Sequence, residues 1–230
     1  MIPKNIHLIF LRKNEPFPEL FEKCRLQIEA NHLCWNILLY NEDDIQQILN
    51  QHLREYTRVY NSFVYNVQKA DFLRLALVYI YGGFYMDLDM LSLKPLDELR
   101  SCQLVLGEEK TVSIAEQQAM NLKYRIRIAN YMFGGIPQHP FLYKMMDEMA
   151  KRASIKLNSQ QDILDITGPG LMTDTYWNNF SAYQDITLLR NRDKQCIQPY
   201  HNQISCHFGD YAAHLHEGTW RREVAIEDIK

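Results

Sequence analysis

Cysteine is scarce in this sequence, and the few cysteines do not form a binding pattern. The five cysteines among 230 residues are odd in number and scattered, with no C-x-x-C spacing. This distribution argues against a disulfide framework and against a zinc site. It favours a protein of a reducing compartment.

Charge excess and long apolar runs are also missing. A net charge of -3 gives no electrostatic reason to expect a nucleic-acid partner. The longest apolar run, residues 72–85, is broken by Arg74 and two glycines, so we predict no transmembrane segment. Residues 1–10 lack the basic start and long apolar centre of a signal peptide. We expect a cytoplasmic protein; peripheral binding at the cytosolic membrane face and secretion without a signal peptide are the open alternatives.

The pattern of elements favours an α/β fold. No internal repeat, low-complexity tract or linker interrupts the chain, so we expect one domain over residues 1–230. Strand, helix, strand and helix are predicted in turn, at residues 2–11, 18–31 and 35–40 and after a cap at Asn41 or Glu42. This alternation indicates a parallel sheet with crossover helices.

Helices and a strand are also predicted in the rest of the chain. Helices are predicted over residues 67–81, 140–155 and 160–166, a strand over residues 104–108, and a further helix at residues 171–177. Gly82 and Gly83 are placed to end the first of these helices in a left-handed cap.

Two aspartates stand out after that glycine pair. Residues 84–90 are predicted to form a strand, in which Tyr85, Asp87 and Asp89 share one face. Two carboxylates on one face repel each other unless a cation lies between them. Mg²⁺ and Mn²⁺ are the divalent cations that oxygen ligands suit best. The pair therefore indicates a metal–phosphate site at a strand end, although a solvated strand end would carry the same spacing.

The preceding helix carries a charged pair on an apolar surface. Asp71 and Arg74 lie three residues apart, as in a modest surface ion pair. The helix around them is otherwise apolar, and a buried charged pair contributes little to stability. We therefore favour a role in holding a polar ligand.

These motifs together resemble glycosyltransferase family 32 and its relatives. The run A-D-F-L-R at residues 70–74, followed by Y-G-G-F-Y-M-D-L-D at residues 81–89, resembles the core of that family. Other family motifs are similar to I-P-K-N-I-H-L-I-F (residues 2–10), N-Y-M-F-G (130–134), H-P-F (139–141), T-G-P-G (167–170) and H-L-H-E-G-T-W (214–220). The order of the motifs is also that of the family.

The resemblance implies a GT-A fold, with a mixed central sheet flanked by helices. A donor-nucleotide part would occupy about residues 1–110, and an acceptor side with a C-terminal lid about residues 111–230. The implied enzyme depends on Mn²⁺ or Mg²⁺ and moves a hexose from a nucleotide sugar with retention of configuration. A UDP-sugar is favoured over GDP-mannose, and the acceptor would be a glycan, a lipid-linked saccharide or a protein.

The resemblance also implies roles for single residues. Asp71 and Arg74 would bind hydroxyls of the donor sugar, and Tyr85 would lie close to the donor. Asp87 would contact ribose or metal-bound water, and Asp89 would bind the metal directly. The remaining implied residues are Asn130 near the reacting carbon or acceptor, His216 or Glu217 as a further metal-side group, and His214, Thr219 and Trp220 at the diphosphate.

The chain departs from the family pattern at two places. The tryptophan that stacks on the nucleobase in the toxin relatives is Phe10 here, and the terminal serine is Thr219. Aromatic stacking and a hydroxyl are kept at these positions. His214 could also be a core residue.

Two other functions remain open. One is a metal-dependent phosphohydrolase, although Met90 and Leu91 after Asp89 do not match the haloacid-dehalogenase-like motif. The other is a catalytically silent nucleotide-sugar-binding protein, against which the retained Asp71, Arg74, Asp87 and Asp89 argue.

Overall fold

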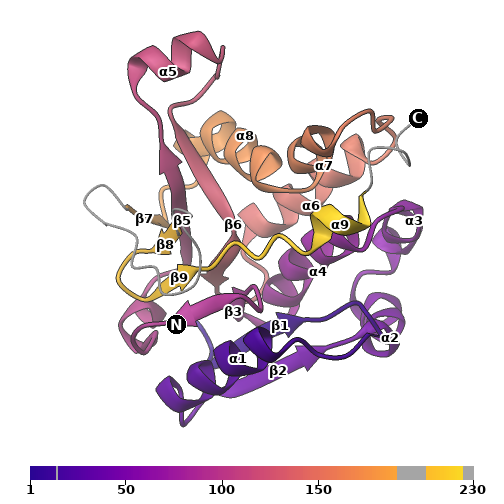
Figure 1. Ribbon diagram of the computed structural model, residues 1–230, viewed down its shortest axis with the longest axis vertical. Coiled ribbons are helices and arrows are strands. Elements are labelled where there is room, and N and C mark those ends of the chain that lie inside the picture. Colours follow the sequence, from indigo (N-terminus) through magenta and orange to yellow (C-terminus); the bar gives the residue numbers. More distant parts are fainter. Residues whose placement is uncertain (14, 191–205, 225–230) are drawn as a thin grey trace.

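The computed structural model describes residues 1–13, 15–190 and 206–224, and its centre is a six-stranded sheet (Figure 1). The strand order is β2-β1-β3-β6-β5-β7. These strands are β1 Asn5–Ile9, β2 Asn36–Tyr40, β3 Gly83–Met86, β5 Leu104–Thr111, β6 Ile126–Gly135 and β7 Ile186–Leu189.

The sheet is mixed rather than all parallel. β1 runs parallel to β2 and β3, and β5 runs parallel to β7. β6 runs antiparallel to both β3 and β5. The parallel pairing predicted for the strands of the first fifty residues is confirmed, and so is the mixed sheet that the resemblance implies. Periodicity predicts no strand at β6 because its second half is buried on both faces, which removes the polar–apolar alternation.

The other elements surround this sheet. The helices are α1 Glu19–Asn31, α2 Glu42–His52, α3 Thr57–Ser62, α4 Asn66–Tyr81, α5 Ile114–Ala119, α6 Pro140–Arg152, α7 Gln160–Ile166, α8 Pro169–Asn179 and α9 Trp220–Glu223. Within the described ranges, 3₁₀ helices lie at Arg54–Tyr56 (η1), Asp97–Ser101 (η2) and Phe180–Ala182 (η3). A second, antiparallel sheet has the order β4-β9-β8, with β4 Met90–Ser92, β9 Ala212–His214 and β8 Cys206–Phe208. No helix in the described ranges is long and apolar enough to cross a membrane.

The first four elements follow the predicted strand–helix–strand–helix order. Asn41 caps α2 through a capping box, in which its side chain accepts a hydrogen bond from the Asp43 N–H, and the Asp44 carboxylate accepts one from the Asn41 N–H. α6 and α7 also lie where they are predicted, although α6 ends at Arg152.

A glycine pair joins α4 to β3, as predicted. Gly82 and Gly83 have φ angles of 62° and 113°, which residues other than glycine rarely adopt. A Cβ on Gly83 would lie 2.5 Å from the carbonyl oxygen of Asn5, so glycine allows β3 to pair closely with β1. This turn brings the middle of α4 next to the end of β3.

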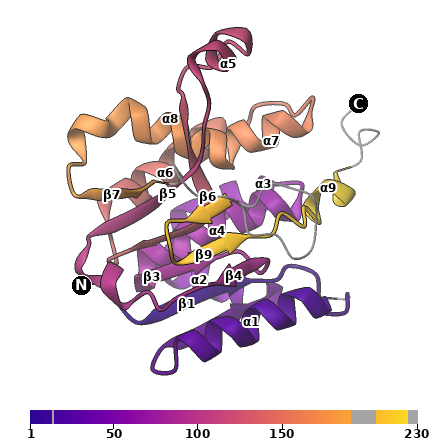
Figure 2. The same ribbon diagram turned by 60° about the vertical axis from the view of Figure 1, so that its left-hand side comes forward.

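Apolar side chains cover both faces of the sheet. On one face α2, α3, α4, α6 and α8 form a core cluster that includes the fully buried Phe72, Phe133 and Phe141. On the other face α1 and the small sheet pack around Phe84 and Phe208. Between β5 and β6 an extension projects from this body and carries α5 at its tip (Figures 1 and 2). We call this extension, residues 110–125, the arm.

Candidate active site

Asp87 and Asp89 lie in the turn that follows β3. β3 ends at Met86, the Asp87 N–H donates to the Tyr131 carbonyl of β6, and the Met90 N–H donates back to the Asp87 carbonyl. The chain then leaves the central sheet and enters β4 of the small sheet. The predicted continuous strand over residues 84–90 is therefore wrong, and the turn, not strand alternation, brings the two carboxylates together.

His214 joins these carboxylates from the far end of the sequence. It is the last residue of β9 and pairs with Met90 of β4. Its Nε2 lies 3.1 Å from Oδ1 of Asp89 and 3.9 Å from Oδ2 of Asp87. One ligand atom from each of the three residues can be chosen so that all lie within 4.8 Å of one another.

Backbone groups fix this cluster in place. The Glu217 N–H donates to Oδ2 of Asp89 at 3.0 Å, and the Leu215 N–H donates to the Asp89 carbonyl. The ring of Tyr131 stacks on His214 with centroids 4.5 Å apart. The three metal-ligand candidates are therefore held by β6, β4 and the segment after β9.

Burial and mutual charge shift the pKa values of all three side chains of the cluster. Burial and the nearby Asp89 raise the pKa of Asp87, and Arg74 only partly offsets this. Burial also acts to raise the pKa of Asp89, but His214 and the Glu217 N–H lower it below its usual value. For His214, burial acts to lower the pKa, but the two carboxylates raise it. The cluster thus favours positive charge between the aspartates.

These three side chains fit a divalent cation. Two carboxylates and one imidazole are a donor set that Mn²⁺ accepts, whereas Mg²⁺ prefers oxygen ligands alone. Nδ1 of His214 is buried without a hydrogen-bond partner among the described residues. The side chains of His216 and Glu217, which the resemblance implies as metal ligands, do not belong to this group of ligand atoms.

Asp71 and Arg74 form a buried ion pair on α4, beside the cluster. The exposed fractions of their side chains are 3% and 7%, and Nη2 of Arg74 lies 3.1 Å from Asp71 and 3.4 Å from Asp87. Nη1 of Arg74 donates to the Asn130 carbonyl at 2.7 Å. Nε of Arg74 is buried and has no partner among the described residues. The guanidinium thus connects the α4 pair to Asp87 and keeps one donor unused.

Two more side chains hold the Asp71 carboxylate. Asn130 Nδ2 donates to Oδ1 at 2.9 Å, and the Thr167 hydroxyl donates to Oδ2 at 2.7 Å. Burial nevertheless raises the pKa of Asp71 to about 6, although Arg74, Thr167 and Asn130 act in the opposite direction. Thr167 was not among the predicted site residues; its only signal in the sequence is the T-G-P-G motif that opens α8.

Tyr85 lies beneath the site rather than at its surface. Its side chain is almost fully buried, and its hydroxyl donates to Oδ1 of Asp87. The guanidinium of Arg74 lies 4.7 Å from the centre of its ring. Tyr85 therefore positions Asp87 and Arg74.

The remaining predicted residues lie after β1 and after β9. Phe10 follows β1, is half-buried, and packs edge-on against Phe17 with ring centroids 4.9 Å apart. Thr219 and Trp220 lie at the start of α9 and are half-buried. His216 has a φ of 56°, and its ring lies 4.2 Å from that of His214.

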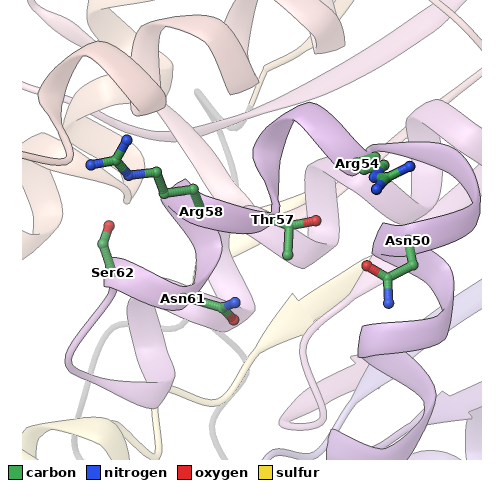
Figure 3. Close-up of a pocket in the computed structure, with 6 residues that line it drawn as sticks. All are labelled: Asn50, Arg54, Thr57, Arg58, Asn61 and Ser62. Atoms are coloured by element: carbon green, nitrogen blue, oxygen red, sulfur yellow. The ribbon is translucent and has the colours of Figure 1, made fainter.

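A separate polar pocket of about 580 Å³ lies between α2 and α3 (Figure 3). Its lining contains none of the predicted site residues and comprises Asn50, Arg54, Thr57, Arg58, Asn61 and Ser62. The guanidinium groups of Arg54 and Arg58 point away from each other, so they do not converge on one ligand (Figure 3). The pocket is not part of the candidate active site.

Comparison with known proteins gives one family match. Residues 15–106 match the family described as "glycosyltransferase sugar-binding region containing DXD motif". This range contains Asp71, Arg74 and both aspartates of the turn after β3.

Relatives and solved structures agree with that match. The chain is 31% identical to inositol phosphoceramide mannosyltransferase 1 of Schizosaccharomyces pombe over 155 residues, which are 65% of this chain and 43% of the relative. It is 25% identical to an uncharacterized glycosyltransferase of Acanthamoeba polyphaga mimivirus, over 98% of this chain and 86% of the relative. The PaToxG glycosyltransferase structure superposes with a TM-score of 0.53 at 16% identity, over 80% of this chain and 75% of that one. The fold is therefore the GT-A fold that the resemblance implies.

Proposed function

Because residues 15–106 match the sugar-binding region of glycosyltransferases with a D-x-D motif, we propose that the chain transfers a hexose from a nucleoside diphosphate sugar to a hydroxyl acceptor. The observation that carries this proposal is the convergence of two buried groups of side chains at the end of β3. One group is the cluster of Asp87, Asp89 and His214, and the other is the Asp71–Arg74 pair with Asn130.

The cluster is the proposed place of the metal and the diphosphate. Asp87, Asp89 and His214 would hold Mn²⁺ or Mg²⁺, with Mn²⁺ favoured by the imidazole. A divalent cation bound there neutralises charge on the departing diphosphate. Thr219 and Trp220, at the start of α9, are the proposed contacts to the phosphates from the opposite side.

Asp71, Arg74 and Asn130 are the proposed sugar-binding groups. Asp71 accepts hydrogen bonds and Arg74 donates them, so the pair can bind neighbouring hydroxyls of one hexose. The unused Nε donor of Arg74 supports this role. These contacts orient the anomeric carbon and lower the barrier by positioning. Asn130, which is half-buried beside them, is proposed to face the reacting carbon or the acceptor.

The proposal also covers the nucleotide of the donor and the stereochemistry of transfer. Phe10 is placed under the nucleobase, with a UDP-sugar as the favoured donor over GDP-mannose. The reaction proceeds with retention, by front-face attack of the acceptor rather than through a covalent intermediate. Closure of the segment over residues 206–220 excludes water from the donor.

The acceptor is proposed to be a glycan, a lipid-linked saccharide or a protein hydroxyl. The fission yeast relative is named for transfer of mannose to inositol phosphoceramide. This chain spans 43% of the length of that relative. A mannose donor and a phosphoinositol-containing lipid therefore belong in the test set.

The first test is thermal unfolding with UDP or GDP, each with and without Mn²⁺. A ligand that binds the folded state raises the unfolding temperature with its concentration relative to its Kd. We expect UDP with Mn²⁺ to raise it and the same UDP with EDTA to have a much smaller effect. Transfer or slow hydrolysis of UDP-glucose, UDP-galactose, UDP-N-acetylglucosamine and GDP-mannose then identifies the sugar.

Three outcomes would contradict the proposal. A larger shift with GDP would reverse the donor preference. Release of inorganic phosphate from simple phosphate esters, without sugar release from any nucleotide sugar, would indicate a phosphohydrolase. Binding of nucleotide sugar without turnover across all acceptors would indicate a silent binding protein.

A further inference from the structure

The tip of the arm exposes apolar side chains. None of the residues of α5 is buried. Ile114 begins this helix and Met120 follows it, and each has an exposed fraction of 59% (Figures 1 and 2). α5 lies at the tip of the extension that projects from the central sheet (Figure 1).

Hydrogen bonds, not burial, define the shape of this tip. Ser113 and Glu116 form a reciprocal capping box at the start of α5. The side-chain amide of Gln117 donates to the carbonyl of Leu122 at 3.0 Å and closes the loop after the helix. Since a six-residue helix is not stable by itself in water, these contacts hold it in a defined form.

The base of the arm is fixed to α8. The ring of Tyr124 stacks on Trp177 with centroids 5.9 Å apart. The Tyr124 hydroxyl and the Lys123 ammonium both donate to the side-chain oxygen of Asn178, at 2.7 and 2.9 Å. The arm is thus a braced extension that presents Ile114 and Met120 to the outside.

Three cations lie on the segments that carry the tip of the arm. Lys110, Lys123 and Arg125 are exposed, and none of the three forms an ion pair in the described part of the chain. Glu109 pairs with Arg127 at 2.6 Å, and Glu116 of the capping box is the one acid within residues 110–125. Residues 110–125 therefore carry three cations and one acid, a net charge of +2, in a protein whose net charge is -3.

We propose that the arm docks on an anionic phospholipid bilayer. Apolar side chains that enter the interface, bordered by lysine and arginine at the height of the lipid phosphates, are the chemistry of peripheral membrane contact. In this arrangement Ile114 and Met120 enter the interface, and Lys110, Lys123 and Arg125 lie against the phosphates.

Docking would place the candidate active site near the membrane surface. β6 leads directly from the arm to Asn130 and Tyr131, and five residues of strand from Arg125 to Asn130 span roughly 17 Å. A membrane-borne acceptor would then lie within reach of the site. This consequence rests on the proposed function, whereas the bilayer contact does not.

The test is cosedimentation of the full chain with vesicles. One vesicle set is phosphatidylcholine alone, and the other contains phosphatidylserine and phosphatidylcholine at 3:7. We expect binding to the second set, with reduced binding at high salt and no displacement by soluble glycerophosphoserine. The double variant Ile114→Asp with Met120→Asp should reduce binding to the level seen with phosphatidylcholine.

Two matched controls separate docking through the arm from nonspecific binding to vesicles. Leu33→Asp removes a side chain that is 87% exposed and lies two residues after α1. α1 and α5 lie at opposite ends of the molecule (Figure 2). Arg54→Gln with Arg58→Gln removes two exposed cations of the α2–α3 pocket, for comparison with Lys110→Gln and Arg125→Gln.

The expected pattern is specific to the arm. Leu33→Asp and the Arg54/Arg58 variant should bind as the parent does, and the Lys110/Arg125 variant about twentyfold more weakly. The proposal is overturned if the parent chain does not bind anionic vesicles. It is also overturned if the Ile114/Met120 variant binds as well as the parent while circular dichroism shows that it is folded. A third contradicting result is that the control variants weaken binding as much as the arm variants do.

Discussion

The Thr167 hydroxyl donates a 2.7 Å hydrogen bond to Oδ2 of Asp71, a residue 96 positions earlier in the chain. The other oxygen of that carboxylate accepts from Asn130. The same hydroxyl oxygen lies 3.1 Å from the Ile163 carbonyl of α7, the helix that Thr167 follows. The T-G-P-G segment thereby orients a proposed sugar-binding carboxylate.

Replacement of Thr167 by valine should therefore impair sugar positioning. The change keeps the shape of the side chain but removes a hydrogen bond to a charged group, an interaction that contributes about 2 kcal/mol. We expect kcat/KM for transfer to fall about tenfold or more. Thr167→Ser, which keeps the hydroxyl, should restore most of the activity.

The pH profile separates this effect from a loss of packing. The hydroxyl favours the ionised form of Asp71, whose pKa is already raised to about 6. Its removal should raise that pKa further and move the acid limb of kcat/KM to higher pH. A Thr167→Val enzyme with lower stability but an unshifted acid limb would contradict the positioning role.

Asp89→Asn should nearly abolish transfer while the chain remains folded. The amide keeps most of the shape of the carboxylate but removes the charge that faces His214. We expect at least a hundredfold loss of kcat/KM and loss of the Mn²⁺-dependent part of the UDP thermal shift. Asp43→Asn, at an exposed pair with Lys13, is the matched control and should behave as the parent. Near-normal activity of Asp89→Asn would exclude Asp89 from the metal site.

Phe10→Ala should weaken donor binding more than it changes the chemical step. Loss of an aromatic platform under the base should raise KM for the donor about tenfold, with kcat within a factor of about three. The control is Phe17→Ala, which removes the edge-on partner of Phe10. If both variants raise KM equally, the effect comes from packing, and Phe10 does not stack on the base.

Local patterns predict the helices and strands of the first half well. α1, β2, α2, α4 and the glycine turn depend on caps and periodicity within a few residues of each other. β6 could not be predicted in this way, because it is buried on both faces and its partners β3 and β5 are set by long-range pairing. Local patterns therefore do not predict which strands run antiparallel, although the family resemblance implies a mixed sheet.

In the candidate active site, too, local patterns predict some features and long-range pairing decides the others. The sequence alone indicates that Asp87 and Asp89 act together, but it predicts the wrong local form for them. The chain turns after Met86 because β4 pairs with β9, more than a hundred residues later. That same pairing, rather than any local signal, decides that His214 approaches the carboxylates while the ring of His216 lies beside it.

His7 offers a test of the fold that does not depend on the proposed activity. It is fully buried on β1, where Nε2 lies 2.9 Å from the Gly82 carbonyl and Nδ1 lies 3.1 Å from the Tyr40 hydroxyl. Burial lowers the pKa of His7 to about 4, although the hydrogen bond to Gly82 acts in the opposite direction. The imidazole is therefore neutral in the folded protein.

The neutral His7 should make the protein lose stability in mild acid. Above pH 6.5 the imidazole is neutral in both states, and its contribution to stability is complete. As the pH falls from 6.5 towards 4, the unfolded chain binds a proton that the folded chain excludes, so the free energy of unfolding drops. Between pH 7.5 and pH 5 the loss from this residue should be about 2 kcal/mol. His7→Gln keeps a donor for Gly82 but cannot titrate, so urea unfolding should show it losing less stability over that interval. Equal losses in the two proteins would show that His7 is charged, or free to become charged, in the folded state.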